Sequence, residues 1–563
     1  MNRTRIIFSA AVALTLAGVA SAPPAPAQTA SDPVFSEARV AEDIRILASD
    51  RFGGRAPASP GEALTVAYLI DQFRKAGLQP GGERLKGRRG WTQSVPLQRS
   101  SFVAVPQAAL SGIGPLVQGK DIALRPPQDG HTAYRLAGAP LVFVGYGVSA
   151  PELGWDDYKG VDLRGKVAVV LVNDPDFADP DCTLGCRFGG KAMTYYGRWT
   201  YKFEELARRG AAGVLIVHED APAAYGWGTV AGSNGIETFD ILRRNAARSH
   251  TAAEAWISRD AALALLKASG QDLEELRRRA MTPAFAPVPL TPRLDLSYTA
   301  RTGVIRTRNV VALLPGRTRP NETLIYSAHW DHLGTRTPDA TGDRIANGAR
   351  DNASGTAIVL ELARAWAKAP RPARSVVFLA VTAEERGLLG SDYYGQNPLY
   401  PLATTVAAIN FDNAFNPAGA TRNFTVKGLA QNDLLDRLIA VGKTRGMAFS
   451  PDAHPEAGLF YRSDHFSFAR VGVPTLSYDP GLDLVDGGTA RGEALRADYI
   501  ARRYHQNGDE WAPDWNYAGV IQTLGIAWTL GRRLAEGRDW PQWTPGTEFA
   551  PVRAKSAGQR GGH

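Results

Sequence analysis

Three short apolar segments of this 563-residue chain lead into residues that can bind a metal ion. Their β-branched and aliphatic composition is typical of buried strands. Open α/β sheets place their active sites at the carboxyl ends of such strands. The pattern therefore predicts an α/β fold with a mostly parallel, doubly wound sheet that brings the three residues to one edge. The segments and the residues that follow them are 323–328 with His329, 375–382 with Glu384, and 405–411 with Asp412.

Asp351 belongs to a different element. Residues 356–366, which follow it closely, have the apolar spacing of an amphipathic helix, and 352–355 lead into that helix. An aspartate at this point can face the same crevice as the three strand ends. The sequence thus predicts a cluster of acidic and imidazole side chains from four separate segments.

The number of carboxylates exceeds what one zinc ion requires. Two divalent ions in one site lie ~3.5–4 Å apart, so a carboxylate between them must offset their repulsion. Asp351 is the natural bridge. In the simplest allocation one ion binds His329, Asp351 and Asp412, and the other binds Asp351, Glu385 and His505. Imidazole and carboxylate ligands suit zinc, and an open position leaves room for water or substrate.

Adjacent glutamates cannot both point at the same metal ion. Glu385 is therefore assigned as the ligand, and Glu384 as the general base that takes a proton from the attacking water. Asp331, two residues after His329, is expected to accept the other imidazole N–H and so to set the tautomer of that ligand. Three other histidines are predicted to be structural or to support the ligands: His332, His454 and His465.

Several segments resemble the co-catalytic di-zinc aminopeptidase family, among them Ser-Ala-His-Trp-Asp-His at 327–332. The resemblance implies a zinc exopeptidase-like fold, two zinc ions per chain, and ligands and a general base at the positions named above. It also offers Tyr461 as a residue that polarises the scissile carbonyl. The family includes glutamate carboxypeptidases, mono-zinc glutaminyl cyclases and receptors without metals, so membership alone does not establish peptidase activity. The segments are 309–316, 327–332, 348–355, 382–391, 410–412, 461–465 and 504–505.

The start of the chain has the pattern of a Sec-type signal peptide with an Ala-x-Ala cleavage site. Its features are Arg3 and Arg5, an apolar core at 6–20, and Ala25-Pro-Ala27. The apolar core is shorter than the ~20 residues that span a bilayer, so we expect a periplasmic or secreted protein without a membrane partner. Cys182 and Cys186 fit an exported chain that keeps a short disulfide, with a pair of free thiols as the alternative.

Length and composition predict more than one domain, because 563 residues with 44% hydrophobic content exceed what a single core usually holds. Segments beginning at 141, 165 and 202 resemble a protease-associated domain, a β-rich insert that the family often carries. The expected division is a signal peptide at 1–27, a discontinuous catalytic domain at 28–101 and 289–545, an insert domain at 102–288, and a disordered tail at 546–563.

The net charge of +8 comes from 64 basic and 56 acidic residues, and it falls to +6 when Arg3 and Arg5 leave with the signal peptide. The basic residues are dispersed along the chain. A nucleic-acid partner would require a concentrated stripe, so none is expected.

The hypothesis that these observations favour is an aminopeptidase that hydrolyses peptides through a water activated by two zinc ions. A carboxypeptidase or dipeptidase of the same family is one alternative, and it would need a cation for the substrate carboxylate, such as Arg350. A binding protein without activity is another. The Gly-x-Ser-x-Gly and His-Glu-x-x-His patterns are absent, which argues against serine hydrolases and zincins.

Overall fold

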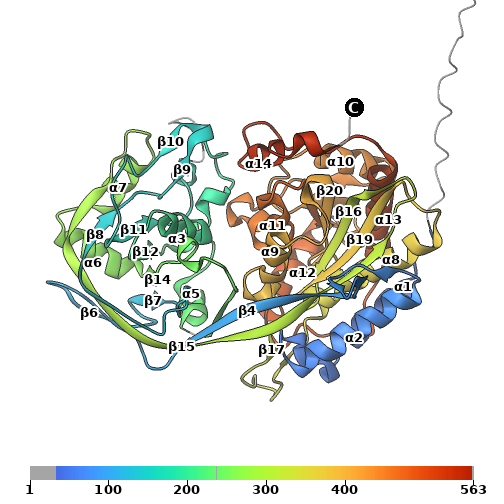
Figure 1. Cartoon of the computed structure of the whole chain (residues 1–563), viewed down its shortest axis with the longest axis horizontal. Coiled ribbons are helices and arrows are strands. Elements are labelled where there is room, and N and C mark those ends of the chain that lie inside the picture. The colour runs from blue at the N-terminus through green and yellow to red at the C-terminus, as the bar shows by residue number, and fades with distance from the viewer. Residues whose placement is uncertain (1–32, 180, 182, 184–185, 236, 561–563) are drawn as a thin grey trace, which may run out of the picture.

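The computed structural model describes residues 33–560 apart from 180, 182, 184–185 and 236 (Figure 1). The predicted signal peptide at 1–27 and Cys182 lie outside these residues. Cys186 is disulfide-bonded, and no described cysteine is free. Within the described part of the chain, no helix combines the length and the apolar character needed to cross a membrane.

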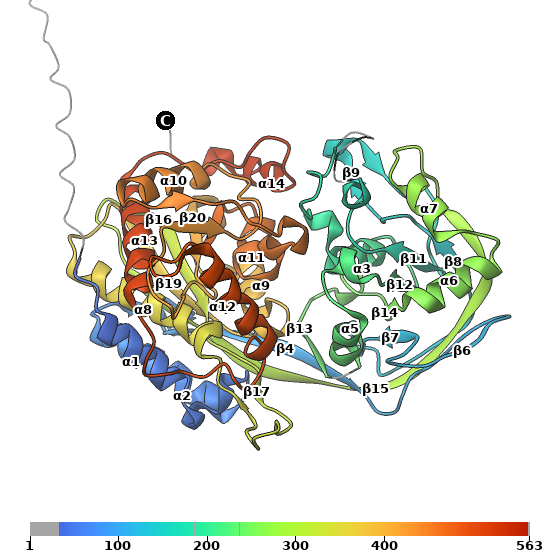
Figure 2. The ribbon, with the colours of Figure 1, turned by 180° about the vertical axis from the view of Figure 1, so that it is seen from behind.

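The larger of two lobes is built on a mixed sheet with a parallel centre (Figures 1 and 2). The adjacent parallel strands are, in order, β19 (Arg374–Val381), β16 (Arg319–His329), β20 (Thr405–Asn410) and β23 (Thr475–Pro480). Antiparallel strands flank them, with β15 (Val288–Leu314) beside β19 and β21 (Asn423–Val426) beside β23. The predicted α/β fold with a mostly parallel sheet is confirmed.

Helices cover both faces of this sheet, because successive strand residues point to opposite sides. On β16, Leu324 and Tyr326 belong to one apolar core and Ile325 to another. The first core includes α1 (Glu37–Leu47), α2 (Pro60–Lys75), α8 (Gly355–Lys368), α10 (Leu434–Thr444) and α13 (Ala518–Glu536). The second includes α9 (Leu389–Gln396) and α11 (His465–Arg470). The sheet is therefore doubly wound, as the sequence predicts.

The smaller lobe has its own apolar core around a second set of parallel strands. These strands are, in spatial order, β8 (Ala133–Phe143), β11 (Val167–Leu171), β12 (Gly213–Val217) and β14 (Ala253–Ile257). The helices that pack on them are α3 (Trp199–Arg208), α6 (Arg259–Ala268) and α7 (Leu273–Ala280). The likeness of this lobe to a protease-associated domain stays a prediction.

Strand β15 belongs to both lobes. Its residues 288–299 pair with β8, and its residues 300–310 pair with β4 (Thr92–Phe102). Leu290 and Leu294 are buried in the core of the smaller lobe. The chain therefore leaves the smaller lobe later than the boundary expected between 288 and 289. The sequence does not mark this point, because the strand is continuous and has no turn there.

The expected disordered tail at 546–563 is wrong for the residues that are described, which extend to Arg560. Phe549 is buried against Trp543 and Phe460. Arg553, on α14 (Ala550–Ala554), is buried and donates hydrogen bonds to the main-chain oxygens of Leu402 and Thr405 at 3.2 and 3.0 Å. Two anchoring side chains thus order a segment whose polar, glycine-containing sequence favoured disorder.

Candidate metal centre

The predicted site residues meet at the carboxyl ends of the parallel strands. His329 is the last residue of β16, and Asp412 lies two residues after β20. Glu384 and Glu385 form the short helix η7 (Glu384–Arg386) after β19. Asp351 lies in a kinked segment immediately before α8. His505 joins them from the loop after α12 (Gly488–Arg502).

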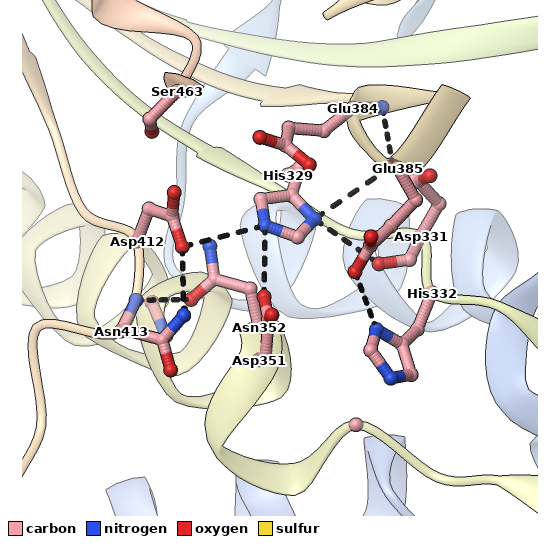
Figure 3. A network of polar contacts seen from close by, with 12 residues as sticks. His329, Asp331, His332, Asp351, Asn352, Glu384, Glu385, Asp412, Asn413 and Ser463 are labelled. Carbon is pink, nitrogen blue, oxygen red and sulfur yellow. Dashed lines mark hydrogen bonds and ion pairs between the residues drawn. The ribbon is translucent and has the colours of Figure 1, made fainter. Parts of the chain in front are cut away.

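The first cluster surrounds the buried imidazole of His329. Its Nε2 atom lies 3.3 Å from Oδ1 of Asp351 and 3.6 Å from Oδ1 of Asp412 (Figure 3). This trio is one of the groups whose ligand atoms lie close enough together to hold a metal ion. These are the three residues that the sequence analysis assigned to the first ion.

The second cluster uses the other carboxylate oxygen of Asp351. Nε2 of His505 lies 3.3 Å from Oδ2 of Asp351 and 3.2 Å from Oε2 of Glu385. One carboxylate therefore faces two sets of ligands, each with an imidazole and a second acidic group. This is the geometry expected of a bridging ligand.

The positions of these nitrogen and oxygen atoms suit bound divalent cations better than direct hydrogen bonds between the side chains. Nε2 of His329 is buried without a hydrogen-bond partner among the described residues, which is costly unless another partner binds it. The spacings of 3.2–3.6 Å match the edges of a tetrahedron around zinc, about 3.3 Å for metal–ligand bonds of ~2.0–2.1 Å. The first cluster can thus hold a zinc ion, and the imidazole–carboxylate spacings of the second cluster are of the same size.

Asp331 does not make the contact that the sequence predicted. Nδ1 of His329 lies 3.1 Å from the main-chain oxygen of Asp331 and 3.8 Å from its carboxylate. The turn after His329 brings the carbonyl nearer, so the carbonyl accepts the N–H and leaves the Nε2 lone pair for a metal. The Asp331 carboxylate instead accepts a hydrogen bond from the main-chain N–H of Glu384 at 3.1 Å.

Glu384 has a buried carboxyl group whose pKa is raised. Burial raises the pKa of its carboxyl group well above the usual value, the positive charge of His329 opposes this, and the charges of Asp412 and Glu385 add to the rise. No hydrogen bond from the described residues reaches its carboxylate, which lines an open cavity. The group is placed to exchange protons with a molecule in that cavity.

Asp509 orders the bridging segment, and the sequence analysis missed it. Its buried carboxylate accepts hydrogen bonds from the main-chain N–H groups of Arg350 and Asp351 at 3.1 and 2.9 Å. It lies in a polar loop, where nothing in the local pattern distinguishes it from a solvated aspartate.

Lys427 is a second residue that the sequence analysis missed. Its ammonium group donates to the main-chain oxygen of Asp412 at 2.6 Å and lies 3.3 Å from the Oδ2 atom of that residue. Burial opposes the charge of Lys427, but Asp412 outweighs it and raises the lysine pKa. Lys427 therefore binds the outer oxygen of Asp412 while Oδ1 faces His329.

Arg55 binds the main chain next to the candidate metal centre. Its fully buried guanidinium donates four hydrogen bonds to main-chain carbonyls, and burial lowers its pKa to about 10 despite nearby acidic groups. The acceptors are Leu47, Trp330, Asn347 and Gly348 at 2.6–2.8 Å. Arg55 thus connects the segment between His329 and Asp331 with the segment before Asp351.

The remaining histidines differ in position. Nδ1 of His332 lies 2.6 Å from Oε1 of Glu385, and His332 also belongs to a possible metal-binding group with Asp351 and Glu385. The contact is with the Glu385 oxygen that does not face His505, and the predicted supporting role of His332 stays a prediction. His454 is exposed beside Glu456, whereas His465 is buried against Phe460.

Two other predicted residues lie in places that the sequence could not specify. The Tyr461 hydroxyl contacts Glu548 at 3.4 Å. Tyr504 stacks on the imidazole of His505, with ring centres 4.0 Å apart, and it lines the cavity together with Tyr461. Arg350 packs over the ring of Tyr499 at 4.2 Å and is not one of the described residues that line the cavity.

The centre opens into a cavity of about 400 Å³ between the two lobes. This volume is typical of pockets for small ligands. Residues of both lobes line it, including Asp351, Glu384, Glu385 and Asp412 from the metal centre. A cluster of candidate metal ligands beside an open cavity is the arrangement found in metal-dependent hydrolases.

Residues 309–529 match the model of peptidase family M28. A "Probable zinc metalloprotease" of Leptosphaeria maculans is 35% identical over 130 residues, which cover 23% of this chain and 30% of that protein. "Aminopeptidase NAALADL1" of Mus musculus is 32% identical over 143 residues, covering 23% of this chain and 17% of that protein. The chain spans less than a third of the length of these relatives.

Solved structures are similar over most of the chain. An aminopeptidase from Aneurinibacillus sp. strain AM-1 covers 89% of this chain and 94% of its own, with a TM-score of 0.47 and 17% identity. A zinc aminopeptidase from Bacillus subtilis covers 90% and 96%, with a TM-score of 0.42 and 15% identity.

Proposed function

We propose that this protein is a zinc-dependent exopeptidase, an aminopeptidase that removes N-terminal residues from peptides. The observation that carries the proposal is the position of Asp351. Its two carboxylate oxygens face two separate clusters of ligands, and it lines an open cavity of a size that accepts a peptide end. The match of residues 309–529 to a peptidase family supports the reaction class.

Zinc is the proposed cofactor, with two ions per chain. The imidazole and carboxylate donors suit it, and the names of curated relatives include this metal. When bound, such ions supply Lewis acidity worth several kcal/mol of charge stabilisation. The proposed ligands are His329, Asp351, Glu385, Asp412 and His505.

Glu384 is the proposed general base. Asp331 holds the start of its turn through the main-chain N–H of Glu384, so the carboxylate stays at the cavity wall. A group in this place can take a proton from the attacking water and deliver it to the leaving amine, a transfer that contributes ~10²–10⁴-fold to the rate. Asp331 is a positioning residue in this scheme, because it acts through Glu384 and His329.

The aminopeptidase specificity rests on the charge beside the ligands. Four carboxylates of the metal centre line the cavity, so the positive amino terminus of a peptide is easier to accommodate there than a carboxylate. The name of the mouse relative, an aminopeptidase, agrees with this direction.

A pair of peptides tests the specificity. They have the same sequence, and one carries an acetyl group on its N-terminus. The purified zinc-loaded protein should release the first residue of the free peptide and leave the acetylated peptide intact, as read by mass spectrometry. Cleavage of both at similar rates would contradict the aminopeptidase proposal, whereas the loss of all cleavage on chelation would still support a metal-dependent peptidase.

Export to the periplasm or the medium is part of the proposal and rests on the N-terminal pattern. The test is the N-terminal sequence of the protein recovered from those fractions. We expect it to begin at Gln28, and full-length protein retained in the cytoplasm would contradict export.

A further inference from the structure

Two arginines from different lobes line the cavity beside the metal centre. Arg198 precedes α3 of the smaller lobe. Arg462 ends the short helix η10 (Leu459–Arg462) of the larger lobe. Both side chains contribute to the wall of the same cavity as Glu384 and Asp412.

Neither arginine has a carboxylate partner among the described residues. Nε of Arg198, and Nε and Nη2 of Arg462, are buried without a hydrogen-bond acceptor in the part of the chain that the structure describes. The other contact of Arg462 is with the ring of Tyr225, 5.6 Å from its centre. Buried cationic donors without partners are costly, so their presence indicates a partner that arrives with the ligand.

Three of the four other arginines in the cavity wall form ion pairs within the protein. Each lies 2.5–3.1 Å from an acidic oxygen of the protein itself. These pairs are Arg125 with Glu254, Arg243 with Asp240, and Arg470 with Glu204. The lack of a partner at Arg198 and Arg462 is therefore not a general property of the cavity wall.

The two unpartnered groups repel each other. Burial lowers the pKa of Arg198 to about 10, and the positive charge of Arg462 contributes to the fall. The surrounding contacts nevertheless keep the lobes together at this point. Tyr195 packs on Phe466 at 5.2 Å between ring centres, and Arg470 binds Glu204 at 3.0 Å.

We propose that Arg198 and Arg462 together bind a carboxylate group of the substrate. The planar guanidinium donors match a carboxylate, and a pair can bind both of its oxygens. The inference rests on the proposed function. It defines the substrates as short peptides whose carboxylate and scissile bond fit into the same cavity. The carboxylate is either the C-terminus of a dipeptide or tripeptide or the side chain of an acidic residue next to that bond.

Matched substrates test this proposal. A dipeptide with a free C-terminus is compared with its C-terminal amide in the zinc-loaded protein. A charge-assisted interaction in a buried site corresponds to roughly a ten- to hundred-fold preference in kcat/KM. We expect wild-type protein to prefer the free acid by this factor, and Arg198→Gln and Arg462→Gln to lose the preference, as read from the ratio of kcat/KM for the two substrates within each variant. Arg135→Gln, at an exposed arginine of β8 outside the cavity, is the control.

A second pair of substrates separates the two sources of the carboxylate. Longer peptides with Glu or Gln as the second residue are compared in the same way. A preference for Glu without a preference for the free dipeptide acid assigns the subsite to an acidic side chain. Wild-type protein that prefers neither carboxylate would overturn the proposal, as would variants that lose all substrates equally.

Binding gives a readout that does not depend on hydrolysis. N-acetylglycine should bind the zinc-loaded protein more tightly than N-acetylglycinamide, as measured by calorimetry. The difference should disappear in Arg198→Gln and Arg462→Gln, and Arg198→Lys should keep part of it because the charge remains. Zinc content reports whether each variant is folded at the centre. Equal affinities in wild-type protein would refute the carboxylate subsite even if peptides were cleaved, and failure to cleave any peptide would refute only the proposed function.

Discussion

Replacing Arg55 by methionine should destabilise the protein and weaken the metal centre at the same time. Arg55 donates four hydrogen bonds to buried carbonyls. Hydrogen bonds from a charged donor contribute about 1.5–3 kcal/mol each, which gives roughly 6–12 kcal/mol for four. Removing the charge recovers its desolvation cost, which is several kcal/mol. We therefore expect the free energy of unfolding to fall by about 3–5 kcal/mol.

Urea unfolding of the zinc-free protein measures this loss. With a urea dependence of about 3 kcal/mol/M, the midpoint should fall by about 1 M or somewhat more. Arg45→Met is the matched control, because Arg45 forms an exposed ion pair with Glu42, and such pairs contribute at most about 1 kcal/mol. Zinc retention should fall in Arg55→Met alone, since Arg55 binds the segments on either side of the ligands. A midpoint shift no larger than that of Arg45→Met would refute this reasoning.

Three further predictions concern the site and the smaller lobe. Asp351→Ala should lower the occupancy of both metal positions together in elemental analysis, because its two oxygens face both clusters; loss of a single ion would argue against bridging. Glu384→Gln should reduce hydrolysis by roughly two or more orders of magnitude with zinc retained, whereas Glu385→Gln should lose zinc, and the reverse result would exchange their roles. Burial lowers the pKa of His250, but Glu254 and Asp240 outweigh it and raise the value to about 10. His250 therefore stabilises the fold fully below its unfolded pKa of ~6.5 and loses this effect as pH rises through 10. His250→Gln should accordingly lower the urea midpoint at pH 6 and lower it less near pH 10; a deficit that does not change with pH would contradict the charge argument.

The strand ends were predictable because they leave a local signal. The apolar runs before His329 and Asp412 are buried strands, and parallel strands end at one edge of a sheet. Asp351 could be added because a helix start is also recognisable from its neighbours. Those signals extend over a few residues, so a local pattern was enough to predict which of these side chains meet in one cluster.

The supporting residues left no such signal. Arg55 and its acceptor Gly348 are 293 residues apart, and Asp509 and Asp351 are 158 apart. Hydrogen bonds over such separations depend on how the chain folds back, which periodicity does not describe. The Asp331 carboxylate was misassigned for a related reason, because spacing alone does not distinguish a side chain from the carbonyl of the same residue.

The sequence by itself determined the class of fold and the residues proposed as ligands, since both follow from short-range patterns of apolar and metal-binding residues. The tertiary structure alone decided which oxygen of Asp351 faces which cluster, how β15 serves two cores, and that Phe549 and Arg553 order the end of the chain. It also brought Arg198 and Arg462 to one cavity. The physical reason is the same in each case. These features arise from contacts between segments that are far apart along the chain, and such contacts leave no local pattern in the sequence.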